Sequence, residues 1–162
     1  MNRVAQFLPV SQGRFRVDWE QTFPDLPVPG QIRLPRRATT GSAGYDFFAP
    51  MAFQMEPGQT MKIPTGVRAR IEEGWVLMLF PRSGLGFKYR LQLNNTVGIV
   101  DADYFNALNE GHIFIKLTNA GDRPLSVKAG EAFAQGVFVP YGLTEDDDAS
   151  EQRFGGFGST DH

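Results

Sequence analysis

The fold is indicated most clearly by the stretch MKIPTGVRARIEEGWVLMLF, residues 61–80. In its first half, apolar residues at positions 67, 69 and 71 alternate with arginines at 68 and 70. This period of two is typical of a strand with one buried and one solvated face. In its second half, WVLMLF at 75–80 is apolar without interruption, which predicts a strand buried on both faces.

The same patterns recur along the chain. Alternating residues appear at 113–117 and again at 133–139, and 18 glycines and 11 prolines are scattered between the apolar pieces. Frequent turn residues favour many short strands over long helices. We therefore predict an all-β fold, a barrel or a jelly-roll-like double sheet. No helix longer than a turn or two is expected, and the best short candidates are DADYFNALN at 101–109 and residues 145–152.

The chain of 162 residues suits a single domain with one core. Residues 1–143 are predicted to form the β domain, in which residues 1–35 are a proline-rich arm with a first edge strand. Residues 144–162 are predicted to form an acidic linker, TEDDDASEQ, followed by the glycine-rich tail RFGGFGST. Glycine-rich backbone is costly to order, so this tail either has no role or becomes ordered when a ligand binds.

Composition excludes several classes of function. The net charge of −2 gives no basic field that would gather nucleic acid, so phosphate binding must be local. With no cysteine there is no disulfide, thiolate nucleophile or cysteine-bound metal, and two histidines are too few for a histidine-rich zinc site. No apolar run approaches the roughly 20 residues of a membrane span, so no membrane partner and a cytoplasmic location are the expectations.

Short segments of small and polar residues lie between the expected strands. Asp46 follows a Gly-Ser-Ala-Gly turn, where it is either a ligand or a turn carboxylate. PRSGLG at 81–86 offers an arginine, a serine and backbone amides, as a phosphate cradle or as a plain loop.

Two further segments carry polar groups of the same kind. NNTVGIVDADYF at 94–105 combines amides that can read a base edge with Asp101, a carboxylate that can take a proton, although an ordinary turn is the alternative. Gln135 lies among apolar neighbours and needs a hydrogen-bond partner, which the backbone could supply.

Taken in order, these segments and the tail resemble the motifs of the trimeric dUTP diphosphatase (dUTPase) family. The matching segments are AGYDFFAP, PRSGLG, NTVGIVDADY, GEAFAQ and RFGGFGST, and the resemblance runs from about Leu34 to Thr160. It implies a homotrimer of jelly-roll-like subunits that hydrolyses dUTP to dUMP and pyrophosphate with Mg2+. That reaction prevents uracil incorporation into DNA and supplies dUMP for thymidylate synthesis.

The resemblance also implies a role for each matching residue. Asp101 would be the general base for the attacking water, and Tyr104 would pack against the deoxyribose and exclude UTP. Asp46 would reach Mg2+ through water. The uracil edge would be read by Asn95, Gly98 and Ile99, and the phosphates would be held by Arg82, Ser83, Gly84 and Gln135.

The tail would then be a flexible lid over the nucleotide. The resemblance implies that Phe157 stacks on uracil, that Gly158 lets the backbone approach, and that Arg153, Ser159 and Thr160 bind the γ-phosphate. In the homotrimer, the active sites would be shared between subunits, with the lid of one closing over Asp101 of another.

The sequence departs from the family pattern mainly at FNALNEGH, residues 105–112, which lengthens the segment after Tyr104. A longer or bulged hairpin is expected there. Two alternative functions remain: a dCTP deaminase-like enzyme of the same fold, and a nucleotide-responsive regulatory protein. Release of pyrophosphate, ammonia or neither from dUTP and dCTP would distinguish them.

Overall fold

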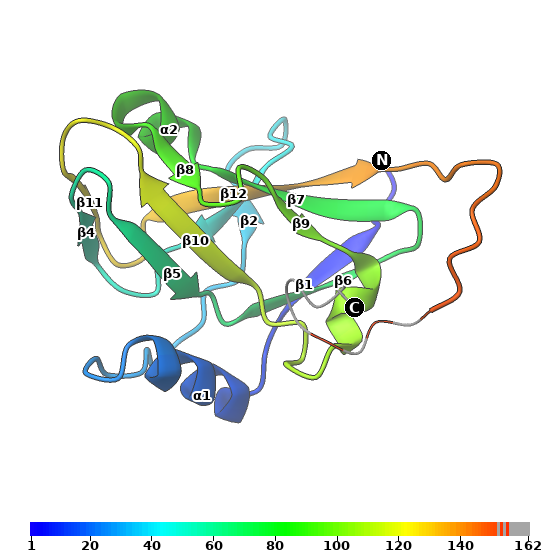
Figure 1. Cartoon of the computed structure of the whole chain (residues 1–162), viewed down its shortest axis with the longest axis horizontal. Coiled ribbons are helices and arrows are strands. Elements are labelled where there is room, and N and C mark those ends of the chain that lie inside the picture. Colours follow the sequence, from blue (N-terminus) through cyan, green and yellow to red (C-terminus); the bar gives the residue numbers. More distant parts are fainter. Residues whose placement is uncertain (152, 154, 156–162) are drawn as a thin grey trace.

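The computed structural model describes residues 1–151, 153 and 155, and these form a mainly β architecture (Figure 1). The largest sheet has the strand order β2-β3-β12-β7-β9, a second sheet has the order β5-β10-β8, and two pairs, β1-β6 and β11-β4, complete the arrangement. Every pairing is antiparallel. The strands are β1 (Ala5–Pro9), β2 (Arg36–Arg37), β3 (Tyr45–Phe48), β4 (Phe53–Met55), β5 (Thr60–Pro64), β6 (Val67–Ile71), β7 (Trp75–Pro81), β8 (Leu91–Leu93), β9 (Gly98–Val100), β10 (Phe114–Asn119), β11 (Leu125–Val127) and β12 (Ala132–Pro140).

The predicted strands are confirmed, and the predicted edge strand of the arm is β1, which pairs with β6. The prediction that β7 is buried on both faces is wrong for this chain. Leu77 and Leu79 are buried, whereas Val76, Met78 and Phe80 are only half-buried. The reason is that the core of the chain covers one face of the largest sheet and leaves the other partly open.

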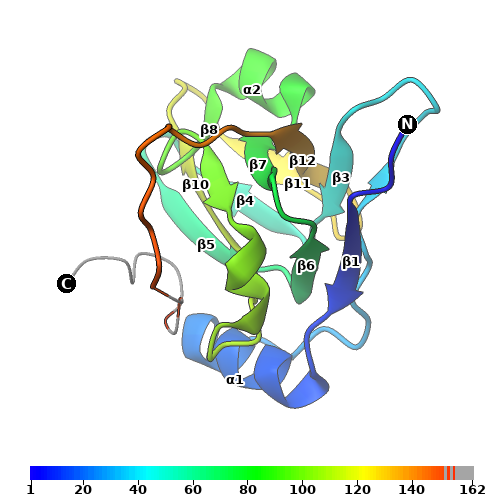
Figure 2. The same ribbon diagram turned by 90° about the vertical axis from the view of Figure 1, so that its right-hand side faces the viewer.

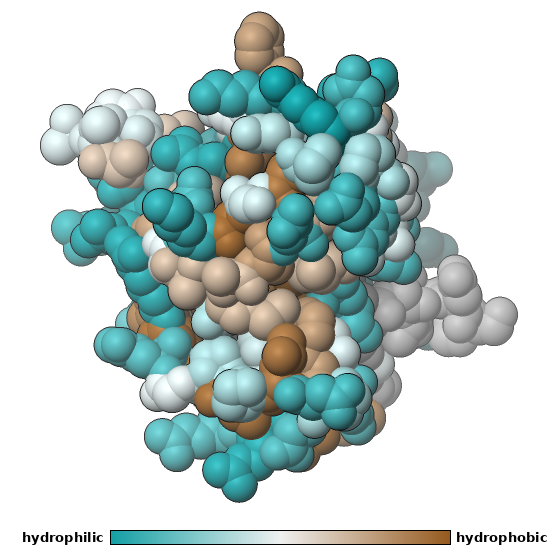
Figure 3. Space-filling view, turned by 90° about the vertical axis from the view of Figure 1, so that its left-hand side faces the viewer, coloured by the Kyte–Doolittle hydropathy of each residue, from teal (hydrophilic) through white to brown (hydrophobic). Residues whose placement is uncertain are grey.

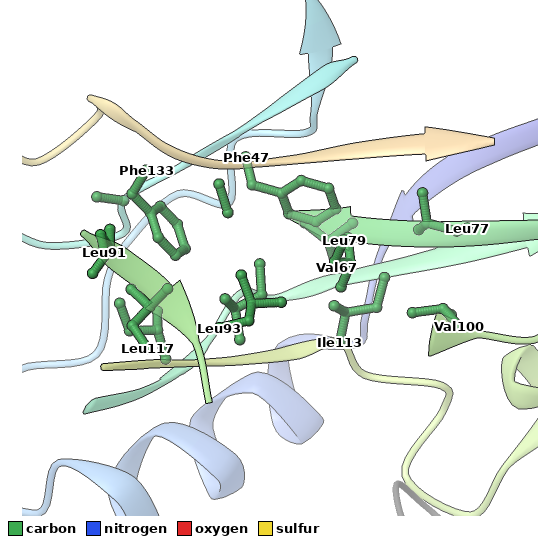
Figure 4. Close-up of a cluster of buried hydrophobic side chains, with 14 of the residues drawn as sticks. Phe47, Val67, Leu77, Leu79, Leu91, Leu93, Val100, Ile113, Leu117 and Phe133 are labelled. Atoms are coloured by element: carbon green, nitrogen blue, oxygen red, sulfur yellow. The ribbon is translucent and has the colours of Figure 1, made fainter. Parts of the chain in front are cut away.

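The core lies between the sheets, where side chains from β3, β6, β7, β8, β10 and β12 meet (Figure 4). Among the side chains drawn there are Phe47, Val67, Leu77, Leu79, Leu117 and Phe133. Burying one such side chain contributes about 1.5–3 kcal/mol relative to leaving it exposed. On the face that carries α2 and β11, some apolar side chains stay at the surface among hydrophilic ones (Figure 3).

The arm contains a helix, α1 (Gln12–Thr22), so the prediction of no helix longer than a turn or two is wrong. Ser11 caps its N-terminus, and its Oγ accepts a hydrogen bond of 3.1 Å from the Arg14 amide. Phe15 and Trp19, one turn apart, are buried and hold the helix beside β5 (Figures 1 and 2). One apolar pair among charged residues is too weak a pattern to predict a helix.

Two further helices lie next to the predicted site segments. PRSGLG is more than a loop, because α2 (Ser83–Tyr89) starts within it. The first short helical candidate is confirmed as the 3-10 helix η1 (Ala102–Asn106). The second is wrong, since residues 145–151, the described part of that segment, contain no helix. No helix in the described part of the chain is long and apolar enough to cross a membrane.

Candidate functional site

Three of the predicted site residues meet at one end of the largest sheet, which we call the Arg82 end: Asp46, Arg82 and Gln135. The register of β12 with β3 and β7 places Gln135 opposite both Asp46 and Phe80. Arg82 follows the last residue of β7, and its Nε lies 3.2 Å from Asp46 Oδ1. The Arg82 side chain is 38% exposed, so it remains accessible to an anion.

Gln135 has the hydrogen-bond partner that its position requires. Its Nε2 donates to the carbonyl of Pro81 at 3.2 Å, and the partner is therefore backbone. Its Oε1 lies against Gly44, where an added Cβ would approach this oxygen to 2.6 Å. Gly44, in the first motif, thus leaves the space that the Gln135 side chain occupies.

Ser83 and Gly84 are exposed in the first turn of α2, directly after Arg82. Arg82 itself is fixed at the N-terminus of the helix, because its amide donates to the carbonyl of Phe133 at 3.1 Å. The Arg82 end therefore groups all four residues that the sequence assigns to phosphate binding, together with Asp46.

The residues predicted to read the base lie in the turn between β8 and β9 and on β9 itself; the two strands belong to different sheets, so the expected hairpin is not formed. Asn95 is exposed in that turn, and Ile99 is 44% exposed on β9. Gly98 is buried against Leu79, whose Cβ would lie 3.0 Å from a Cβ at position 98. A side chain at position 98 would therefore need Leu79 to move by a few tenths of an ångström, so glycine favours the close contact of β9 with β7.

Asp101, Asp103 and Tyr104 form a second group, the Asp101 end, where β9 runs into η1. The side chains of Asp101 and Asp103 are 48% and 55% exposed. Tyr104 is buried, its hydroxyl donates to the carbonyl of His112 at 2.6 Å, and Asn109 Nδ2 donates to the same hydroxyl at 2.8 Å. Burial raises the pKa of Tyr104 to about 12, against an opposing effect of the hydrogen bond from Asn109.

Arg153 lies on both carboxylates of the Asp101 end. Its Nη2 lies 2.7 Å from Asp101 Oδ2, and its Nε lies 3.0 Å from Asp103 Oδ1. The predicted γ-phosphate contact of Arg153 stays a prediction, since in this chain its guanidinium is paired with carboxylates. The other lid residues assigned from the sequence lie outside the described residues: Phe157, Gly158, Ser159 and Thr160.

The two groups lie at opposite ends of β7 (Figure 1). Val100 of β9 pairs with Leu77, so Asp101 comes next to Val76, near the start of β7. From Val76 to Arg82, at about 3.3 Å per residue, the separation along the strand is on the order of 20 Å. One chain therefore does not bring Asp101 together with the phosphate-binding residues.

Some contacts of this site have little or no signal in the sequence. The family resemblance assigns no role to Asp103. Its closeness to Asp101 in the sequence is the one hint that a single cation, here Arg153, could pair with both carboxylates. The contacts of Asn109 and His112 with Tyr104 fall in the segment that departs from the family pattern, and no signal in the sequence pointed to them.

The raised pKa of Tyr104 predicts a measurable pH dependence. Because the ordinary value is 10.0 and the folded value is about 12, the unfolded chain loses its proton first as the pH rises, and stability falls over that interval. Ultraviolet titration should show one tyrosine ionising near pH 12, and Tyr104→Phe should remove that component. A Tyr104→Phe profile identical to the wild type would contradict the assignment.

Comparison with known proteins gives matches that cover most of the chain. The sequence model of the family described as dUTPase matches residues 30–161. A deoxyuridine 5'-triphosphate nucleotidohydrolase from Lactococcus lactis is 42% identical over 132 residues, covering 80% of this chain and 88% of the relative. The crystal structure of a dUTPase from Streptococcus mutans is similar with a TM-score of 0.64 and 34% identity, over 86% of this chain and 98% of that one.

A third comparison concerns a mutant dUTPase from phage phi11 of S. aureus, whose structure is described as revealing the coordination of a structural Mg(II) ion. It is 23% identical, with a TM-score of 0.64, over 92% of this chain and 98% of the phage protein, and shows the shared fold. The match of the family model over most of the sequence, together with the 42% identity to the Lactococcus relative, is decisive: the chain belongs to the dUTPase family.

Proposed function

We propose that this protein hydrolyses dUTP to dUMP and pyrophosphate, with Asp101 as the general base for the water that attacks the α-phosphorus. The position of Asp101 carries the proposal: its carboxylate is half-exposed directly beyond β9, the strand that carries Gly98 and Ile99. If the uracil of dUTP binds near those residues, the α-phosphate of the same nucleotide would lie toward Asp101. A carboxylate within hydrogen-bond reach of water can remove its proton as the phosphorus is attacked.

The direction of the nucleotide supports a site shared between subunits. Gly98 pairs with Leu79, whereas Asp101 lies next to Val76, farther from Arg82 than the base-reading residues are. A triphosphate that extends past Asp101 would therefore point away from the Arg82 of the chain that provides Asp101. The β- and γ-phosphates lie only a few covalent bonds from the α-phosphate, so the Arg82 end that holds them would come from a second copy.

The open face of the largest sheet supports association of copies. Its half-buried apolar residues come from neighbouring positions of two paired strands, β7 and β12: Val76, Met78, Phe80, Val137 and Val139. An apolar sheet face is stable when another layer covers it. Closed symmetry would place the same face of each copy around a common axis, and we propose the homotrimer on this basis.

Tyr104 would discriminate between sugars, and the phosphate contacts would come from Arg82, Ser83, Gly84 and Gln135. Arg153 is paired with Asp101 and Asp103 and offsets one of their two negative charges. On substrate binding, Arg153 would exchange these carboxylates for the γ-phosphate, with the lid residues 157–160 closing over the nucleotide. A cytoplasmic location is retained as part of this proposal.

Mg2+ fits the donor set of the Arg82 end. Among the described residues no group of three or more His, Cys, Asp or Glu side chains could hold a metal ion, and Asp46 is the carboxylate of this end. Mg2+ keeps much of its water and is commonly bound by one or two carboxylates with substrate phosphates, so Asp46 would hold it through water. When bound, the ion would neutralise charge on the phosphates.

The role of Asp101 is tested by replacing it with asparagine. Asp101→Asn should retain dUTP binding and lose about 100-fold to 10,000-fold in kcat, because general-base assistance is removed. Pyrophosphate release measures the rate, and Asp103→Asn is the matched control, since that side chain is also half-exposed and also bonded to Arg153. Equal losses in the two variants would remove Asp101 from its special role.

Sharing of the site is tested by mixing two inactive variants. Asp101→Asn and Arg82→Ala are unfolded together at equal concentration and refolded into mixed oligomers. A site that draws Asp101 from one chain and Arg82 from another is intact with a probability of about one half times one half, so about a quarter of the wild-type activity should return. Mixed oligomers that are confirmed by mass but stay inactive would contradict the shared site.

The space at Gly44 gives a test of the Arg82 end. Gly44→Ala should push the Oε1 of Gln135 aside and raise KM for dUTP several-fold, with little loss of stability because the end of a flexible side chain moves. Gly41→Ala, in the same loop with no atom within 4 Å of its added Cβ, is the control. Identical kinetics in the two variants would show that the position of Gln135 does not matter for phosphate binding.

A further inference from the structure

A buried histidine and a buried aspartate join α1 to the segment that follows η1. His112 is fully buried and Asp18, on α1, is 7% exposed. His112 Nδ1 lies 2.6 Å from Asp18 Oδ2, and the Gly66 amide donates to His112 Nε2 at 2.8 Å. These two bonds satisfy both ring nitrogens, and one of them comes from the arm.

The bond from Gly66 fixes the protonation state of the imidazole. A backbone amide can only donate, so Nε2 carries a lone pair, and the ring proton is on Nδ1, which donates to Asp18. Burial lowers the pKa of His112, against the opposing hydrogen bond and charge of Asp18, and Arg14 and Glu110 also act on it. A neutral imidazole donating to a carboxylate is a directional contact that fixes the ring.

The backbone of His112 in turn holds Tyr104. The carbonyl of His112 accepts the hydrogen bond of 2.6 Å from the Tyr104 hydroxyl. Gly111 just before it has φ of 69°, and an added Cβ there would lie 2.6 Å from the carbonyl oxygen of Tyr104. The segment is therefore pressed against η1, and a shift of His112 would move the anchor of the tyrosine ring.

A second contact joins the start of α1 to the same segment. The Ser11 amide donates to Glu110 Oε1 at 3.0 Å, and its hydroxyl donates to Glu110 Oε2 at 2.6 Å. Burial raises the pKa of Glu110, but the hydrogen bonds from Ser11 and the charges of Arg68 and Arg14 together outweigh this, and the net shift is downward. Residues at the start and in the middle of the α1 segment, Ser11 and Asp18, thus bond to Glu110 and His112.

We infer that α1 is a positioning element for sugar selection, with Asp18 and His112 as positioning residues that act through Tyr104. This inference rests on the proposed function, in which Tyr104 packs against the deoxyribose. Without Asp18, the Nδ1 proton of His112 would be a buried donor with no acceptor, so the imidazole and its backbone would shift. Small misplacements of a positioned group can cost up to about 100-fold in rate.

The test compares dUTP with UTP in variants of α1. Asp18→Ala should lower the ratio of kcat/KM for dUTP to that for UTP by about tenfold, mainly through a higher KM for dUTP. Asp18→Asn, whose amide oxygen can still accept from His112 Nδ1, should stay within about threefold of the wild type. Loss of Asp101 function would slow the hydrolysis of dUTP and of UTP by the same factor. A change in the ratio therefore reports on sugar selection.

Two controls separate positioning from lost stability. Val10→Ala weakens the apolar cluster beneath α1 without touching Asp18, and Glu20→Ala removes an exposed carboxylate from the same helix. Both should keep the wild-type ratio. If Asp18→Ala does not fold, Ser11→Ala loosens the exposed end of α1, and a shift of about twofold in the same direction is expected.

The outcomes also separate this inference from the proposed function. An unchanged ratio in Asp18→Ala, or in Ser11→Ala where that variant replaces it, would overturn the positioning role. An equal fall in Val10→Ala would do the same. If the wild type releases no pyrophosphate from dUTP, the proposed function fails first. If the single variant Tyr104→Ala has the wild-type ratio of dUTP to UTP, Tyr104 does not select the sugar. The positioning inference then fails as well.

Discussion

The antiparallel pairing of β7 with β12 on one side and β9 on the other is the constraint on which the rest of the structure depends. Strand side chains alternate between faces, so the register that buries Leu77 and Leu79 also fixes which residues lie at each end of the strand. A slip of one residue would turn the core residues outward. The burial of two leucines thus determines where Arg82 and Asp101 can be.

Much of this fold could be predicted from the sequence because its signals are local. Alternation at residues 67–71 and the apolar run at 75–80 identify β6 and β7 without any knowledge of their partners. Helix α1 could not be predicted in the same way. Its buried face contains Asp18, a residue that normally indicates a solvated position, and the partner that makes its burial possible is His112, far along the chain.

The sequence assigns candidate residues to the site, but it does not predict their geometry. The motifs suggest which side chains would bind phosphate and which would take a proton, but they do not indicate that Asp101 and Arg82 lie at opposite ends of β7. That separation follows from strand register, which depends on long-range pairing. The contact of Arg153 with Asp101 in its own chain was equally unpredictable, because the acidic linker between them has no pattern that fixes its path.

The arm helix and the segment at 105–112 are best understood as one structural unit. A buried carboxylate without a partner is strongly unfavourable, and so is a buried imidazole with a free donor. Asp18 supplies the acceptor that the buried His112 needs, and His112, together with Arg14, whose Nη1 lies 3.8 Å from Asp18 Oδ1, offsets the cost of burying the carboxylate. The longer segment after Tyr104 therefore needs α1 to bury its histidine. The helix, whose apolar surface is mainly Phe15 and Trp19, is in turn fixed in position by the same bond. Because the carbonyl of His112 accepts from the Tyr104 hydroxyl, the helix of the N-terminal arm is connected to the proposed sugar-binding residue by a short series of buried hydrogen bonds.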